Sequence, residues 1–312
     1  MRVISVAIPK GGEGKTTTSV NLAASLAATE KKTLLIDADT LGASGISLGY
    51  TADQVKSGLY DVFNYTHSLN RVIYKTELTY LDFIPSNIST VQMEERLLRL
   101  SENRTVMRIA LRDIEKQYDY VVIDCPPTLR GITTNALCAS DSVIIPMRAS
   151  HFSLDAVMRL MRYLKWIREV ANPQIYVEGI LLTMHEPNTK IAEITGRELR
   201  SRYSKFLFKV VIPKNSTLAE AAFYGRPALL YNINSKGAQA YFELAMEILA
   251  RDAARGKLRE SVQEDSGSCG ELSDSQRGET RNIFECGAPR RAISAFMGAG
   301  KESLTLRVVP GE

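Results

Sequence analysis

Near its N-terminus, the chain has a glycine-rich loop between a short apolar strand and a helix. The strand is predicted over Val3–Ile8, and a helical pattern begins at Thr17. Between them, residues 9–17 read Pro-Lys-Gly-Gly-Glu-Gly-Lys-Thr-Thr. Glycines allow successive backbone N–H groups to turn toward one anion, and a helix N-terminus adds its positive end. This arrangement predicts a phosphate-binding loop.

The loop departs from the general P-loop spacing at one end. That spacing asks for a glycine five residues before Gly14, where Pro9 stands, and the loop has a second lysine at Lys10. Lys15 is expected to reach the β- and γ-phosphates, and the Thr16 hydroxyl to bind Mg²⁺ directly. The alternative is an ordinary glycine-rich turn, which the number of matching residues disfavours. The expected nucleotide-binding residues of the loop are Lys10, Gly11, Gly12, Glu13, Gly14, Lys15, Thr16 and Thr17.

Beyond the loop, short apolar runs alternate with amphipathic segments. The predicted strands are Val3–Ile8, Thr33–Asp37, Leu81–Ile84, Tyr120–Asp124, Ser142–Pro146, Tyr176–Thr183 and Phe208–Ile212. The predicted helices are Thr17–Ala28, Thr90–Leu100, Arg104–Gln117, Leu154–Val170 (capped by Ser153), Ile191–Tyr203 and Ala238–Asp252. Near-continuous apolar strands are typical of a parallel sheet that is covered on both faces. The alternation predicts a doubly wound α/β fold, with a mostly parallel sheet flanked by helices.

The periodic pattern stops near Asp252, which divides the chain into two parts. Residues 1–252 are expected to form the nucleotide-binding domain, and residues 253–312 a low-complexity, disordered tail that is poor in aromatic residues. A small partner-binding element over Ala292–Val309 is the alternative for the end of that tail.

Composition excludes some classes of protein. No apolar stretch is long enough to span a bilayer, no signal peptide is recognisable, and the four cysteines form no CxxC pair. A reduced, cytoplasmic protein without stable membrane insertion is expected. The net charge of +4 permits contact with nucleic acid or an anionic membrane but requires neither.

The loop and four later segments together resemble the ParA/MinD ATPases, and most closely their ParA or Soj partition branch. Lys-Gly-Gly-x-Gly-Lys-Thr-Thr is similar to the deviant phosphate loop of that family. The later segments are Leu-Leu-Ile-Asp37-Ala-Asp39 (switch I), Tyr-Val-Val-Ile-Asp124-Cys-Pro-Pro (the second acidic motif and switch II), Gly-Ile-Leu-Leu-Thr-Met184 and Val-Ile-Pro213-Lys-Asn215. By motif order the resemblance covers residues 1–250 and leaves the tail outside.

The resemblance implies ATP and Mg²⁺ as cofactors, with slow ATP hydrolysis that a partner stimulates. Lys10 would cross a dimer interface to the partner's ATP, and Asp39 would orient the attacking water. Together with Lys15, these are the expected catalytic residues. Asp39 and Asp124 would contact Mg²⁺ through water, in addition to the direct ligand Thr16.

The same resemblance implies a homodimer that forms in the ATP state, binds double-stranded DNA without sequence preference and releases it on hydrolysis. Its partner would be a ParB-like or centromere-binding adaptor, and the protein would be nucleoid-associated, segregating plasmid or chromosomal DNA. Pro213 and Asn215 would contact the adenine, although an ordinary turn has the same residue types.

Several positions depart from the family pattern. The segment after switch I reads Asp39-Thr-Leu-Gly where the family usually has Asp-Pro-Gln-Gly, and Glu13 occupies a position that is often small and apolar. Thr217 and Asn188 stand where the partition branch often has arginines that contact DNA. DNA binding would then depend on other basic residues.

Two groups of basic residues could supply such contacts. We favour the later one, because the family has its DNA surface in that part of the fold; its candidate DNA-binding residues are Lys190, Arg197, Arg200 and Lys214. The other group recurs every four residues along a predicted helix, at Arg104, Arg108, Arg112 and Lys116. A solvated helix face has the same pattern, so this stripe is either a DNA contact or a solvent-exposed face.

Two rival functions lack their sequence features. A MinD-type membrane positioner needs a terminal amphipathic helix, whereas Ala253–Val262 is too polar and Ala292–Val309 contains two glycines. An electron-transfer relative needs two cysteines per subunit around a bridging cluster, and neither Cys125 nor Cys138 suits that role. An ATPase that positions a cargo other than DNA remains the alternative.

Overall fold

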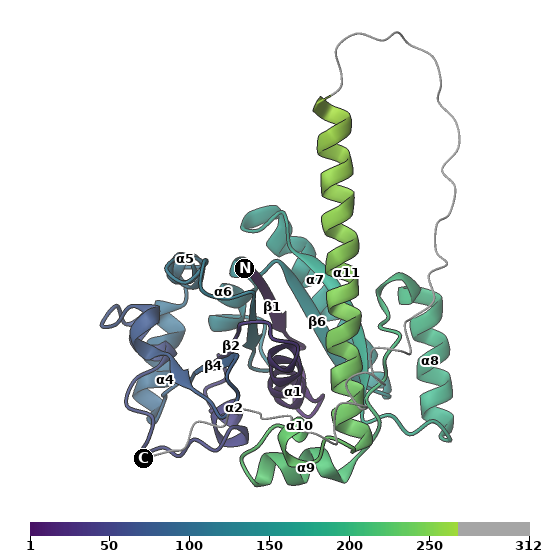
Figure 1. Cartoon of the computed structure of the whole chain (residues 1–312), viewed down its shortest axis with the longest axis horizontal. Coiled ribbons are helices and arrows are strands. Elements are labelled where there is room, and N and C mark those ends of the chain that lie inside the picture. Colours follow the sequence, from purple (N-terminus) through teal and green to yellow (C-terminus); the bar gives the residue numbers. More distant parts are fainter. Residues whose placement is uncertain (268–312) are drawn as a thin grey trace. The chain divides into compact units, whose positions relative to one another are not determined.

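A sheet of seven strands in the order β3-β4-β2-β5-β1-β6-β7 lies at the centre of the molecule (Figure 1). The computed structural model describes residues 1–267. The strands are β1 (Arg2–Val6), β2 (Thr33–Asp37), β3 (Tyr74–Lys75), β4 (Leu81–Ile84), β5 (Tyr120–Asp124), β6 (Ser142–Arg148) and β7 (Tyr176–Thr183). All neighbouring strands are parallel except β3 and β4. Strand β1 lies between β5 and β6, so the loop after β1 lies where the strand order reverses, which is where open α/β sheets bind ligands.

Helices cover both faces of the sheet, with α1 on one face and α6 and α7 on the other (Figure 1). The helices are α1 (Lys15–Ala28), α2 (Ala43–Ser47), α3 (Leu59–Phe63), α4 (Val91–Leu100), α5 (Val106–Arg112), α6 (Ile132–Ala139), α7 (His151–Val170), α8 (Lys190–Tyr203), α9 (Ser216–Phe223), α10 (Ala228–Tyr231) and α11 (Lys236–Gly267). Helix α1 packs against β2 and β5, and α7 packs against β6. The predicted doubly wound α/β class is therefore confirmed.

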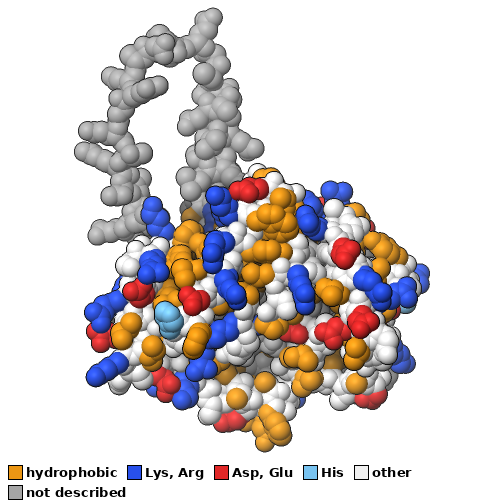
Figure 2. Space-filling model, turned by 180° about the vertical axis from the view of Figure 1, so that it is seen from behind, with side chains coloured by type: hydrophobic (Ala, Val, Ile, Leu, Met, Phe, Trp, Pro, Cys, Tyr) orange, Lys and Arg blue, Asp and Glu red, His pale blue; other side chains and the backbone are white. Residues whose placement is uncertain are grey.

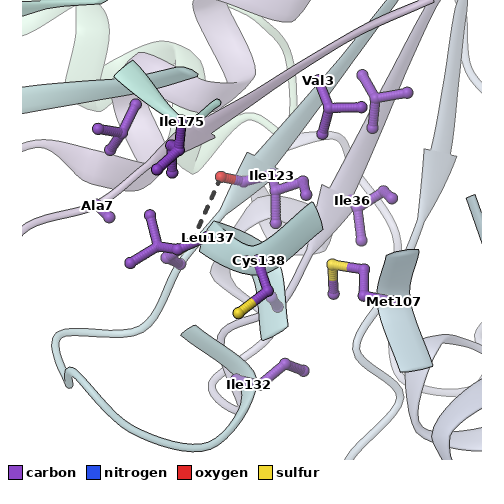
Figure 3. Packing of buried hydrophobic residues seen from close by; sticks show 14 of the residues in the cluster. Val3, Ala7, Ile36, Met107, Ile123, Ile132, Leu137, Cys138 and Ile175 are labelled. Atoms are coloured by element: carbon purple, nitrogen blue, oxygen red, sulfur yellow. Dashed lines mark hydrogen bonds between the residues drawn. The ribbon is translucent and has the colours of Figure 1, made fainter. Parts of the chain in front are cut away.

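One large hydrophobic cluster fixes the sheet to the helices on the α6 and α7 side. Val3 of β1, Ile36 of β2 and Ile123 of β5 contribute side chains to it, and Met107 of α5 and Leu137 of α6 pack onto them (Figure 3). These side chains come from elements far apart in the sequence, and burial of their apolar surface is the main favourable term in folding. The cluster holds the ends of β1, β2 and β5 in a fixed arrangement.

Three elements differ from the sequence prediction. Phe208–Ile212 is not a strand: isolated bridges flank it, Leu207 with Ile180 and Pro213 with His185. Its own backbone donates to β7 at its two ends, from Phe208 to Ile180 and from Ile212 to Leu182. The helix predicted over Arg104–Gln117 is limited to α5. Helix α7 begins at His151, and its cap is Ser150, whose hydroxyl accepts a hydrogen bond from the Ser153 N–H group. Ser153 is thus free of the capping role that the sequence suggested.

The C-terminal part of the described chain is more helical than expected. Residues Met1–Ile248 form one compact unit, and from Leu249 the described residues continue helix α11 to Gly267. The residues after Asp252 begin Ala-Ala-Arg-Gly-Lys-Leu-Arg-Glu, and most of these are strong helix formers despite their polarity. The rest of the predicted tail, including the alternative element at Ala292–Val309, lies outside the described residues.

Candidate functional site

The glycine-rich loop connects β1 to α1 and closes around the side chain of Lys15. Gly12 and Gly14 have φ angles of 73° and 83°, a left-handed conformation that glycine adopts without strain. Gly14 is the N-cap residue of α1, and Lys15 is the first residue of that helix. The Lys15 ammonium is buried and donates a hydrogen bond to the Lys10 carbonyl oxygen at 3.1 Å. The loop therefore has the backbone shape that an anion site at a helix N-terminus requires.

Two carboxylates face each other at the ends of adjacent strands beside this loop. Because β2 and β5 are parallel and in register, Asp37 pairs with Asp124, and both side chains are fully buried. Asp124 accepts hydrogen bonds from the hydroxyls of Ser19 at 3.0 Å and Ser44 at 2.9 Å. Asp37 accepts from the backbone N–H of Ser44 at 2.9 Å. These bonds fix the orientation of both carboxyl groups.

The close packing of these charges changes their proton affinities. Burial raises the pKa of Asp124 to about 6, although hydrogen bonds from Thr16, Ser44 and Ser19 lower it. Burial, and then the charge of Asp124, raise the pKa of Asp37 well above its usual value. Burial lowers the pKa of the Lys15 ammonium, whereas the negative charges of Asp124 and Asp39 raise it and offset part of that shift. The hydrogen bond from Thr16 places its hydroxyl beside the buried Asp124 carboxyl.

Asp39 lies at the edge of the same cluster. Its side chain is buried, its backbone N–H donates to Asp37 at 3.1 Å, and its carboxylate accepts from the Leu41 N–H at 3.2 Å. The structure thus brings Lys15, Thr16, Asp39 and Asp124 together. Within residues 1–267 there is no group of three or more His, Cys, Asp or Glu side chains that could hold a metal ion by themselves. A metal here would need further ligands from a nucleotide or from water.

Glu13 occupies the loop in an unexpected way. Its side chain is completely buried, and its Oε2 atom accepts a hydrogen bond from the backbone N–H of Arg148 at 2.8 Å. Its Oε1 atom accepts from the Ser153 hydroxyl at 3.0 Å and forms an ion pair with the Lys10 ammonium at 2.6 Å. The carboxylate therefore contacts β6 and α7 of its own chain, and Lys10 is held there with it.

Pro213 and Asn215 follow an extended segment that runs beside the end of β7. The His185 N–H donates to the Ile212 carbonyl at 2.9 Å, and the Lys214 N–H donates to the His185 carbonyl at 3.1 Å. Among the described residues, Asn215 Oδ1 and His185 Nδ1 are buried and have no hydrogen-bond partner. Buried polar atoms rarely stay unpaired, so two such atoms on neighbouring segments fit a polar ligand.

The candidate DNA-binding residues are exposed, but two of them are neutralised. Lys190, Arg197 and Arg200 lie on one face of α8. Arg197 pairs with Glu193 at 3.5 Å, and Lys214 pairs with Glu186 at 3.1 Å. Figure 2 shows Lys and Arg side chains spread over the opposite side of the molecule from Figure 1, with Asp and Glu among them rather than one continuous basic surface.

The earlier basic stripe is partly used for packing. The Arg104 guanidinium lies over the Trp166 ring, 4.8 Å from its centroid, and Arg108 donates to the Ala171 carbonyl at 3.3 Å. Two of its four members therefore contact α7 and the residue after it, which favours a structural use for them. No helix in the described part of the chain is both long and apolar enough to cross a membrane.

Sequence reasoning missed several residues of this site. Asp37 ends an apolar strand as Asp124 does, so the same sequence signal identifies it. Ser19 and Ser44 bind Asp124 from α1 and α2, and nothing in their local sequence indicates this. The same holds for Ser150 and Ser153, which contact Lys10 across the fold.

Comparison with known proteins places the chain among these ATPases. A family model described as "AAA domain" matches residues 1–177. The chromosome partitioning protein ParA of Myxococcus xanthus is 37% identical over 258 residues, covering 83% of this chain and 91% of that protein. The sporulation initiation inhibitor protein Soj of Bacillus subtilis is 36% identical over 249 residues, covering 80% of this chain and 98% of Soj.

A solved structure of an enzyme that binds an ATP analogue has a similar fold. Cobyrinic acid a,c-diamide synthase from Mycobacterium smegmatis, with a bound ATP analogue and magnesium, has a TM-score of 0.68 and is 27% identical, covering 80% of this chain and 94% of that one. The sequence matches to ParA and Soj extend beyond the part that the family model covers and include β7, α8 and the segment around Pro213. The chain therefore belongs to the ParA/Soj-type family of partition ATPases.

Proposed function

We propose that this protein is an ATP-dependent switch that dimerises in the ATP state and positions or segregates DNA. The arrangement at the ends of β1, β2 and β5 is the observation that carries the proposal. It places a buried lysine at a helix N-terminus within the electrostatic influence of Asp39 and Asp124. A buried cation with glycine-backbone N–H groups binds phosphate, and adjacent carboxylates hold a hydrated Mg²⁺.

ATP and Mg²⁺ fit the residues that are present. Lys15 would bind phosphate, Thr16 would bind the metal directly, and Asp39 and Asp124 would contact it through water. The unpaired Asn215 Oδ1 is an acceptor that suits the amino group of adenine, with Pro213 beside it. When bound, Mg²⁺ would neutralise charge on the phosphate oxygens.

The hydrolytic roles follow from the same positions. Asp39 would orient the attacking water, because its carboxylate lies beside the phosphate loop and is fixed by the Leu41 N–H. Lys10 would act on the nucleotide of a second copy, so that dimerisation completes the site. Hydrolysis would be slow until an adaptor of the ParB or centromere-binding kind stimulates it.

We further propose that residues 1–252 form the ATPase domain and that its ATP-bound dimer binds the nucleoid in the cytoplasm. Lys190, Arg197, Arg200 and Lys214 would contact DNA phosphates, which gives binding without sequence preference. The relatives named for chromosome partitioning support this reading.

DNA binding is tested by salt titration on two unrelated duplexes, with ATP and with ADP. We expect binding in the ATP state that is equal for both duplexes and falls steeply with salt, and weaker binding with ADP. Equal binding in both nucleotide states would remove the switch from the proposal.

A second candidate, an ATPase that positions a cargo other than DNA, is favoured by one observation. Glu186 and Glu193 neutralise two of the four proposed DNA contacts. Absence of DNA binding at low salt in either nucleotide state would select this candidate over partition.

A further inference from the structure

Glu13 is an unusual residue for a phosphate-binding loop, since it is acidic and its carboxylate is completely buried. A buried carboxylate is costly unless it is paired and hydrogen-bonded. Here the backbone N–H of Arg148, the hydroxyl of Ser153 and the ammonium of Lys10 all contact it. The loop therefore contains its own counter-charge for Lys10.

Lys10 is equally committed to its own chain. Besides the ion pair with Glu13 at 2.6 Å, its ammonium donates to the hydroxyls of Ser153 at 2.9 Å and Ser150 at 3.3 Å. An ammonium group has three N–H donors, so these partners use its full capacity. Its side chain is nonetheless 28% exposed, so Lys10 lies at the surface of the subunit, within reach of another molecule.

We infer that Glu13 positions Lys10 in cis and thereby sets the threshold for ATP-driven dimerisation. This inference rests on the proposed function, in which Lys10 acts on the nucleotide of a second copy. Lys10 must leave Glu13, Ser150 and Ser153 to do so, and these three residues are here called the Lys10 clasp. When Lys10 leaves, the buried Glu13 carboxylate loses its counter-charge, and this cost opposes the release of Lys10.

The clasp makes Lys10 a two-position residue. In the single subunit, Glu13 offsets its charge; in the dimer, phosphate oxygens of the partner's nucleotide would do so. Only a ligand that interacts more strongly with the released position can shift such an equilibrium. ATP has one more phosphate than ADP and is a stronger counter-charge for Lys10. The clasp therefore increases the difference in dimerisation between the ATP-bound and ADP-bound states.

The pairing itself is tested on the nucleotide-free protein, without reference to dimers. Lysine acetylation by limiting acetic anhydride, read by mass spectrometry, reports how freely each amine reacts. Glu13→Gln keeps a side-chain carbonyl oxygen that can accept a hydrogen bond but removes the charge, so we expect Lys10 to react severalfold faster than in the wild type. Exposed Lys190 serves as the internal control and should not change. Equal reactivity of Lys10 in both proteins would overturn the clasp.

The consequence is tested by light scattering over a range of protein concentrations with ATP and Mg²⁺, in the slowly hydrolysing Asp39→Ala background. Glu13→Gln should lower the concentration for half-dimerisation by at least about fivefold, the low end of typical coupling between sites. Ser153→Ala keeps both charges and removes the hydroxyl that bonds Lys10 and Glu13, so its effect should have the same direction and be smaller. In a Lys10→Ala background, Glu13→Gln should have no effect.

If Glu13 has a purely structural role, Glu13→Gln should instead raise the protein concentration for half-dimerisation. A loosened loop would weaken nucleotide binding, and such a rise would overturn the inference. If dimerisation requires Lys10 but is unchanged by Glu13→Gln, then Glu13 does not set the threshold for dimerisation, even if it pairs with Lys10. If the Asp39→Ala chain forms no ATP-dependent dimer at all, the proposed function fails, while the acetylation result still decides whether the clasp exists.

Discussion

Asp124 shows most clearly what the buried charges of this site do to stability. The folded protein holds its carboxyl at a pKa of about 6, above the ordinary value of 3.8, chiefly through burial. A carboxyl with a raised pKa binds its proton more tightly in the folded than in the unfolded state. The stability that this proton provides is full below the ordinary pKa and is lost as the pH rises toward 6.

Asp124→Asn should therefore stabilise the nucleotide-free protein at pH 8 more than at pH 5. The difference between the two pH values corresponds to about 1.4 kcal/mol of unfolding free energy, or a few degrees in thermal midpoint. Thermal melts of wild type and variant at both pH values, without Mg²⁺, check this. A shift in midpoint that is the same at both pH values would contradict the raised pKa.

At this scale, chemistry that is local in sequence could be predicted and contacts between distant residues could not. Lys15 and Thr16 follow from the loop motif, and Asp124 from an acid at the end of an apolar strand. The environment of Glu13 depends on Arg148 and Ser153, which are 135 and 140 positions away in the chain. Only the packing of β6 and α7 beside the loop brings them together.

At the scale of elements, α8 and the segment around Lys214 carry the proposed contact with DNA. Lys214→Ala should weaken binding to all duplexes about equally and reduce the salt slope by about one unit, because it removes one phosphate contact. Glu186→Gln is the matched control: it releases Lys214 from its ion pair and should strengthen binding. A sequence-dependent effect of Lys214→Ala, or weaker binding by Glu186→Gln, would argue against this surface.

The sequence predicts an element where its composition and length together give a clear local pattern. Six predicted strands are present as β1, β2, β4, β5, β6 and β7, because each is mostly buried and rich in apolar residues. Helices α2 and α3 have five residues each, too few to show a helical period. Phe208–Ile212 has a strand composition, but it pairs with β7 only at isolated positions, which no local pattern reveals.

At the scale of the whole molecule, the compact unit Met1–Ile248 contains every residue of the candidate site. A chain ending at Asp252 should therefore keep its fold and its affinity for ATP, although it loses the last part of α11. The thermal midpoint should change by less than about 4 °C, equivalent to roughly 1 kcal/mol for a domain of this size. A much larger fall would show that residues beyond Asp252 support the domain.

In the proposed switch, ATP completes a site between two copies of this chain. Size-exclusion chromatography with light scattering, at saturating ATP and Mg²⁺, tests it most directly with two variants. Lys15→Ala should stay monomeric because it loses phosphate binding, whereas Asp39→Ala should bind ATP, hydrolyse it poorly and run as a dimer. With ADP, both variants should be monomers. An Asp39→Ala protein that remains monomeric with saturating ATP would rule out an ATP site shared between two copies.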